Sequence, residues 1–482
     1  MCVRITLIPA LTIITALIND FSGLLKAAFK RLKSIIDHAP VLLALTLTAC
    51  ATYQAKELNE QAIAQQNANP SIAQLHIQAS QIKHPLLKPI PFDLSDGLSP
   101  DEAAMIAVIQ NPELRVARTK QGIATAQVLQ AGLLPNPRLA YNFAAVTGGL
   151  DQGKVQGYGL SLDWEFTSLL TRSNKVLAAQ AEQQSIDLQI AWQEWQVAQA
   201  AKLACYQLQV YDQQYSLLSE SLKRLDSNKL QIQKALDHGW ATTLENTTAI
   251  IAAEALESRL QAVLQQKQHQ QERLNRVLGQ PPGQIMTYQA TDLPDELITP
   301  NFEQLTQDLT PHRLDLLALK QGYQAQEEQL RIAILQQFPK ISLGLTQTKN
   351  NSNYYTVGAG VALSLPLFDQ NQGVIALATA SRQLLFDEYS NRDFQSKADV
   401  AELLTTITSI NTEIKTARTG LSQLETLFNA YTTANNEHQI DQPTYYAAWN
   451  NVTDKHIEVL TLQLHLIEAR IALETATGRY AL

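Results

Sequence analysis

The chain has 482 residues, which suggests about three domains of ordinary size. Hydrophobic residues make up 45% and charged residues 17%, so the chain is too apolar for a disordered protein and too polar for a multi-span helical membrane protein. The 37 Lys and Arg residues are outnumbered by 45 Asp and Glu, giving a formal net charge of −8. This balance argues against a nucleic-acid partner, because such binding normally needs a basic face.

The sequence also lacks the spacings that metal sites and enzymes need. Its three cysteines, Cys2, Cys50 and Cys205, lie too far apart for a zinc site or a disulfide framework. Its nine histidines form no HExxH or paired-histidine motif. We therefore expect no catalytic residues, no metal site and no non-covalent cofactor, and we expect Cys205, which lies in a helical pattern, to pack in a core.

The N-terminus resembles a bacterial lipoprotein signal. A basic segment and a short apolar run end in Leu47-Thr48-Ala49-Cys50, and the run is too short for a comfortable transmembrane helix. We predict that residues 1–49 are the signal peptide and that Cys50 carries a covalent lipid, with 50–97 as the lipidated N-terminal segment. The alternative is an ordinary signal with an incidental cysteine. Translation could also begin nearer Leu24, since this signal is long.

The chain repeats itself at a spacing of about 200 residues, which indicates a duplicated supersecondary unit. Lys120-Gln121-Gly122 matches Lys320-Gln321-Gly322, and Leu278-Gly279 falls near Thr477-Gly478. We place the first repeat at 98–283, a linker at 284–300 and the second repeat at 301–482.

Each repeat is predicted to run helix, strand, strand, very long helix, turn, helix. In the first, a helix starts at Ser99-Pro100-Asp101-Glu102, breaks at Asn111-Pro112 and stops near Pro135. Apolar residues then alternate with polar or small residues along 138–143 and 157–166, as in strands with one apolar and one wet face. The second repeat shows the same alternation along 341–346 and 357–367.

The helices that follow the strands are unusually long. No Pro or Gly occurs within 161–238 or 240–278, and the second repeat is similar over about 374–436 and 445–477, where Gly420 is the one exception. Helices of this length need lateral partners, as in a coiled coil. The fold class is therefore mainly α with a small β part.

Four amphipathic strands per chain leave open edges, which cannot lie in lipid because each orphan backbone group costs several kcal/mol there. The longer strands have the length needed to cross a bilayer when tilted. Closure then requires several chains that share one transmembrane β-barrel, with the helices extending from it as a tube. A small soluble sandwich is the alternative, although four strands are few for one.

With this arrangement of strands and long helices, the sequence resembles the TolC family of outer-membrane efflux channels. The segments that carry the resemblance are Leu98–Ala103, Asn111–Leu114, Leu133–Pro137, Val277–Gly283 and Leu365–Asp369 with Gly373. The resemblance implies a homotrimer whose barrel takes four strands from each protomer, above a long periplasmic coiled-coil tube. The Leu134–Pro137 and Leu367–Gly373 segments look most like the heavy-metal-efflux branch.

The resemblance also suggests where functional carboxylates lie. In the family, the turns between the long and short helices close the periplasmic end of the tube, and acids there favour cations. The aperture candidates are Asp441, Glu437, Asp237 and Glu245, although such acids can equally solvate a turn or cap a helix. Asp163 and Glu165 lie on the wet strand face and are expected to line the barrel lumen rather than act as a catalytic pair.

We expect a passive outer-membrane exit duct, lipid-anchored at Cys50, that works with a periplasmic adaptor and a proton-driven inner-membrane pump. The alternative is a structural coiled-coil lipoprotein or adhesin without channel activity. An enzyme finds no supporting constellation of residues. The sequence leaves metal ions, drugs and polypeptides open as substrates.

Overall fold

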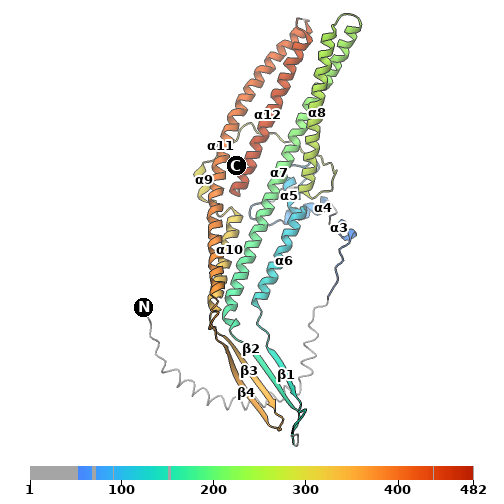
Figure 1. Ribbon diagram of the computed structural model, residues 1–482. Coiled ribbons are helices and arrows are strands. Elements are labelled where there is room, and N and C mark those ends of the chain that lie inside the picture. Colours follow the sequence, from blue (N-terminus) through green and yellow to red (C-terminus); the bar gives the residue numbers. More distant parts are fainter. Residues whose placement is uncertain are drawn as a thin grey trace. The chain divides into compact units, whose positions relative to one another are not determined.

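The computed structural model describes residues 53–67, 72–88, 90, 92–149, 153–437 and 439–480 (Figure 1). The predicted signal peptide and Cys50 lie outside these residues. The chain divides into two compact units, Met1–Ala68 and Asn69–Leu482. In the first unit, α3 (Glu60–Gln66) starts at Asn59, whose side chain accepts the N–H of Ala62 at 2.8 Å. The second unit contains all the other elements of the described residues.

The second unit follows the predicted order of elements twice. Its first part consists of α4 (Ile72–Gln81), α5 (Pro100–Gln110), α6 (Pro112–Gly132), β1 (Arg138–Ala144), β2 (Gly157–Glu165), α7 (Ser168–Asp237) and α8 (Thr243–Leu278). Its second part consists of α9 (Phe302–Gln307), α10 (Leu314–Leu335), β3 (Lys340–Lys349), β4 (Tyr355–Ser364), α11 (Gln372–Asn436) and α12 (Gln442–Thr477). The expected mainly helical, duplicated architecture with a small β part is confirmed.

The ends of the first helices follow from side-chain capping. Ser99 and Glu102 form a reciprocal capping box at the start of α5, with the Ser99 N–H donating to Glu102 Oε2 at 2.9 Å. Asn111 ends α5 and caps α6, where its Oδ1 accepts the N–H of Glu113 at 2.9 Å. Pro112 fits the first turn of α6 because that position needs no N–H donor. The predicted break at Asn111-Pro112 is confirmed.

The two longest helices are α7, with 70 residues, and α11, with 65 residues. At about 1.5 Å per residue they extend roughly 105 Å and 98 Å. The long helix predicted over about 374–436 is confirmed, and α11 runs through Gly420. A single interior glycine costs only about 1 kcal/mol relative to alanine. Burial of Ile414, Ala417 and Leu421 around it holds the helix together.

The helices pack laterally rather than into a compact ball. α6, α7, α10 and α11 lie side by side in that order above the strands, while α8 packs on α7 and α12 on α11 (Figure 1). The core lies between them and includes Trp195, which is fully buried. Cys205 packs in a core cluster, as predicted, and burial raises the pKa of its thiol to about 12. Such a thiol stays protonated and unreactive.

One joint occurs in both repeats. Gly279 ends α8 with a φ of +69° against the carbonyl of Gln110, and Gly478 ends α12 with a φ of +65° against the carbonyl of His312. A side chain ties each joint: Asn111 Nδ2 donates to the Val277 carbonyl at 2.9 Å, and Arg313 Nη1 donates to the Ala476 carbonyl at 2.8 Å. The returning helix of each repeat is thereby fastened beside the helix that leads into the strands.

The strands form one antiparallel sheet in the order β1-β2-β3-β4, so β1 and β4 are its edges. The central pair joins the two repeats, with Leu162 opposite Leu345 and Trp164 opposite Leu343. Among the described residues, no helix combines the length and the hydropathy required to cross a membrane.

Candidate functional site

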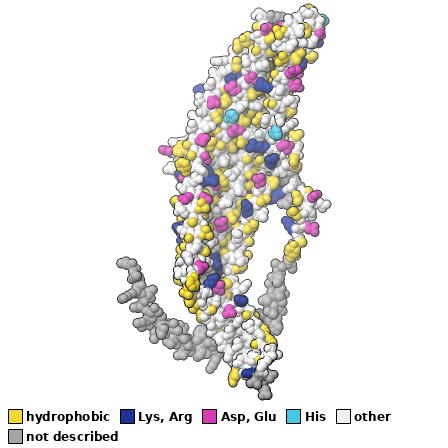
Figure 2. Space-filling model, in the orientation of Figure 1, with side chains coloured by type: hydrophobic (Ala, Val, Ile, Leu, Met, Phe, Trp, Pro, Cys, Tyr) yellow, Lys and Arg dark blue, Asp and Glu magenta, His cyan; other side chains and the backbone are white. Residues whose placement is uncertain are grey.

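One face of the sheet is apolar and uncovered within the described part of the chain. In the register, Leu139, Leu162, Leu345 and Ala359 form one row across all four strands. The three leucines are 64%, 42% and 55% exposed. Charged side chains are scattered over the helices and sparse over the strands in Figure 2. A soluble protein rarely leaves such a patch open, so this face indicates contact with lipid or with another chain.

Aromatic side chains lie on both sides of this apolar row, towards the two ends of the strands. Trp164 and Phe166 lie at the helical end with ring centroids 6.3 Å apart in an edge contact. Phe143, Tyr158 and Tyr355 form the row at the far end of the sheet, since they pair with one another or with Lys349. Aromatic rings at two levels around an aliphatic band are typical of membrane-spanning strands, whose rings sit at the lipid headgroups.

The opposite face carries small and polar residues, and its charges lie near the helical end. Asp163 stands between Arg138 and Gly344 in the register, and Glu165 lies opposite Ser342. Asp163 and Glu165 therefore share this face near the helical end. Lys340 also lies at the helical end of this face, whereas Lys349 lies at the far end of the sheet on the apolar face. The middle of the sheet is free of charge on both faces, as a bilayer core would require.

At the α7–α8 tip, the chain turns through Gly239 with a φ of +74° and restarts at a capping box. The Glu245 carboxylate accepts the backbone N–H of Thr242 at 2.7 Å and its hydroxyl at 2.9 Å. These two bonds lower the pKa of Glu245, against an opposing effect from the negative charge of Asp441. The structure thus brings the Glu245 and Asp441 carboxylates close enough for the charge of Asp441 to act on Glu245.

At the α11–α12 tip, Asp441 is the N-cap of α12. Its Oδ1 accepts the backbone N–H of Thr444 at 2.9 Å. Hydrogen bonding from the side chain and the backbone N–H of Thr444 lowers the pKa of Asp441, which stays ionised. Pro443 fits the first turn of α12, so its position in the tip needs no distortion of the helix.

The side chains of the other two tip acids cap no helix N-terminus. Asp237 is the last residue of α7 and accepts an amide hydrogen bond from Gln233 at 3.0 Å. Glu437 ends α11 and accepts one from Gln439 at 2.7 Å. Negative charge at a helix C-terminus opposes the helix dipole, so helix stability does not account for these acids. Capping does account for Glu245 and Asp441.

Several features of the site are absent from the sequence expectations. The aromatic rows depend on the strand register, which alternation alone does not give. Trp240, at the α7–α8 tip, is 82% exposed and its ring lies beside that of His238. In the sequence, only its position directly after Gly239 indicates that it lies in a turn. In the described ranges, no group of three or more His, Cys, Asp or Glu residues could hold a metal ion.

Comparison with known proteins supports the same architecture. The family model described as outer membrane efflux protein matches residues 305–479. The structure of CusC is similar, with a TM-score of 0.66 and 16% identity, covering 89% of this chain and 99% of CusC. The structure of VceC of Vibrio cholerae has a TM-score of 0.65 and 18% identity, covering 80% of this chain and 97% of VceC.

A third similar structure is that of the open state of the MtrE outer membrane channel of Neisseria gonorrhoeae. It has a TM-score of 0.63 and 14% identity, covering 83% of this chain and 98% of MtrE. Identities this low show a shared fold. The sequence matches none of the curated proteins with which it was compared.

Proposed function

We propose that this chain belongs to the outer membrane efflux protein family, whose model matches residues 305–479, and that it is the outer-membrane exit duct of a tripartite efflux system. The family consists of channels rather than enzymes. In the proposal, a homotrimer conducts substrates passively from a periplasmic adaptor and a proton-driven inner-membrane pump to the outside. The energy comes from the pump, because this chain offers no phosphate-binding loop.

The observation that carries the proposal is the open sheet with its bare apolar face. Its two edge strands leave backbone N–H and C=O groups unpaired, and each such group costs several kcal/mol in lipid. Pairing β1 of one chain with β4 of the next removes both edges at once. Three chains with four strands each then form one barrel, with the aromatic rows at the two lipid–water boundaries.

Conduction by purified trimers tests this proposal against a structural coiled-coil lipoprotein or adhesin. We expect the detergent-solubilised full chain to have the mass of three protomers and to open discrete conducting events in planar bilayers. A monomer that is stable in water, or a trimer that never conducts, would favour the structural alternative. The pump selects the substrate in this scheme, and the heavy-metal branch suggested by the sequence makes metal ions the first class to test.

The lipid anchor at Cys50 is a separate part of the proposal. Cys50→Ser is expected to abolish lipid attachment at this site, because only the thiol can accept the lipid. Incorporation of labelled palmitate measures this directly. Cys205→Ser is the matched control, since that thiol is buried and should not affect labelling. Undiminished labelling of the Cys50 variant would remove this residue from the proposal.

The charge of Asp441 is proposed to favour cations at the periplasmic aperture. Asp441→Asn is the informative change, because asparagine caps a helix about as well as aspartate but carries no charge. We expect lower cation selectivity and weaker block by divalent ions in single-channel recordings, since like carboxylates converge near the threefold axis. Helix content and trimer stability should stay unchanged.

The comparison with Asp441→Ala separates charge from capping. Alanine removes both, and loss of an N-cap typically costs about 1 kcal/mol of stability. If Asn is silent and Ala only lowers the melting temperature, Asp441 is a capping residue, and Asp237, Glu245 and Glu437 remain as the candidates for the aperture charge.

A further inference from the structure

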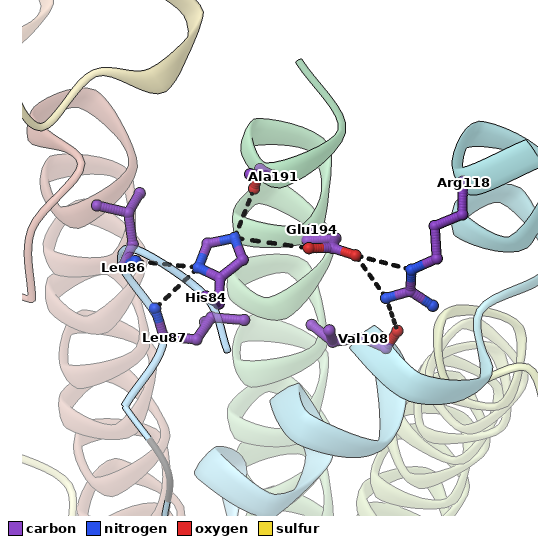
Figure 3. A network of polar contacts seen from close by, with 7 residues as sticks. All are labelled: His84, Leu86, Leu87, Val108, Arg118, Ala191 and Glu194. Carbon is purple, nitrogen blue, oxygen red and sulfur yellow. Dashed lines mark hydrogen bonds and ion pairs between the residues drawn. The ribbon is translucent and has the colours of Figure 1, made fainter. Parts of the chain in front are cut away.

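A buried histidine fastens the segment between α4 and α5 to the helical body (Figure 3). The His84 side chain is 1% exposed. Its Nδ1 accepts the backbone N–H groups of Leu86 and Leu87, each at 3.0 Å, and its Nε2 lies 2.8 Å from the Ala191 carbonyl on α7. The ring therefore ties a turn of its own segment to the longest helix.

These contacts fix the protonation state of the ring. Two N–H donors point at Nδ1, so this nitrogen must keep its lone pair, and Nε2 must carry the proton that goes to the Ala191 carbonyl. A second proton, on Nδ1, would place three N–H donors together in a buried site: the ring N–H and the backbone N–H groups of Leu86 and Leu87. The imidazolium form is incompatible with this arrangement, because no acceptor faces Nδ1.

Two charged residues face the ring. Glu194 of α7 lies 3.7 Å from Nε2, and Arg118 of α6 pairs with the same carboxylate at 2.6 Å while donating to the Val108 carbonyl at 2.7 Å. Arg118 thus offsets the attraction that Glu194 would exert on a charged ring. Burial is the largest influence and lowers the pKa of His84, and Arg118 acts the same way, against the Ala191 bond and Glu194.

The segment held by His84 is part of the apolar core. Leu87 is buried, and Ile82 and Leu86 pack against the same cluster, which includes Trp192 and Trp195 of α7. The turn that His84 closes sets the direction in which Leu86 and Leu87 enter this cluster. Loss of the two hydrogen bonds to Nδ1 would leave both backbone N–H groups unpaired. It would also disrupt the packing of Leu86 and Leu87 in this cluster.

We propose that His84 is a pH-sensitive latch, which holds residues 82–88 on α7 when neutral and releases them when protonated. The sign follows from the linkage between proton binding and folding. The unfolded chain has a His pKa near 6.5, and the folded chain has a lower one. The stabilisation is complete above about pH 6.5 and is lost as the pH falls towards the folded pKa. Acid therefore weakens the attachment of residues 82–88 to α7.

Hydrogen exchange of the full chain in detergent tests the latch. The amides of Leu86 and Leu87 are the reporters, because their N–H groups are the ones bonded to Nδ1. After correction for the intrinsic chemical rate, we expect exchange in the 82–88 peptide to be on the order of tenfold faster at pH 5.0 than at pH 7.5. Peptides in the middle of α7 should change far less.

His84→Asn is the diagnostic variant. An Asn carbonyl can accept the N–H groups two and three residues on, as in an Asx-turn, but it does not titrate. We expect its exchange in 82–88 to be nearly the same at both pH values. His76→Asn is the matched control, since His76 is exposed on α4, and it should behave like the unaltered chain. Equal exchange of the unaltered chain at both pH values would overturn the proposal, even if the variant failed to fold. So would a pH dependence that survives in His84→Asn.

Discussion

Replacing Leu345 with Arg is expected to remove most of the trimer from the membrane. Leu345 lies in the middle of β3 on the uncovered apolar face, between the two aromatic rows. A charge at the bilayer midplane of a membrane barrel costs about 2–4 kcal/mol, and all three chains of a trimer would carry it. Membrane fractionation and the yield of heat-resistant trimer measure the loss.

The neighbouring residue provides the control. Thr346 is also exposed but points to the opposite face of the same strand, beside Ser161 and Gly358. Thr346→Arg should assemble normally, because that face is proposed to be wet, and it should shift ion selectivity towards anions. If both variants are lost from the membrane equally, the two faces are not different and the proposed barrel is wrong.

Gly478→Ala is expected to destabilise the fold by roughly 3 kcal/mol or more, because two penalties add. A left-handed φ of +65° is unfavourable for any residue with a Cβ, and a Cβ here would lie 2.8 Å from the His312 carbonyl carbon and closer still to its oxygen. The carbonyl is backbone and cannot move aside without disturbing the start of α10. Thermal unfolding followed by circular dichroism measures the change.

Gly283 separates the two penalties. It has a similar φ of +78°, but a Cβ there meets nothing within 4 Å. Gly283→Ala should therefore cost only the backbone term, about 1–2 kcal/mol. Equal melting temperatures for the two alanine variants would mean that the joint between α12 and α10 is looser than the structure indicates.

The parts of the fold that depend on local chemistry were predictable from the sequence. Period-two alternation located all four strands, and the Asn111-Pro112 pair located the break between α5 and α6. The long helix predicted over 374–436 does run through Gly420, because packing against α12 outweighs the small helix penalty of one glycine. Local propensity is a weak guide where a helix is held by its neighbours.

The parts of the site that depend on distant pairing were not predictable. The aromatic rows require β2 of the first repeat to pair with β3 of the second, and no local signal sets that register. His84 and Ala191 are 107 residues apart in sequence. The tip acids were found, but their capping roles depend on which residue begins each helix, and turn sequences specify that only to within a few positions.

The small residues of the wet strand face have a consequence for what limits flow. Gly344, Gly358 and Gly360 lie on adjoining strands there, with Thr346 and Ser161 beside them. In a closed barrel these positions leave the bore about as wide as the backbone allows, and the charged residues of this face sit only towards its helical end. In the proposed channel, this end would be wide and would discriminate little between substrates. Resistance to flow, and any selection by charge, would then fall to the proposed aperture at the opposite end.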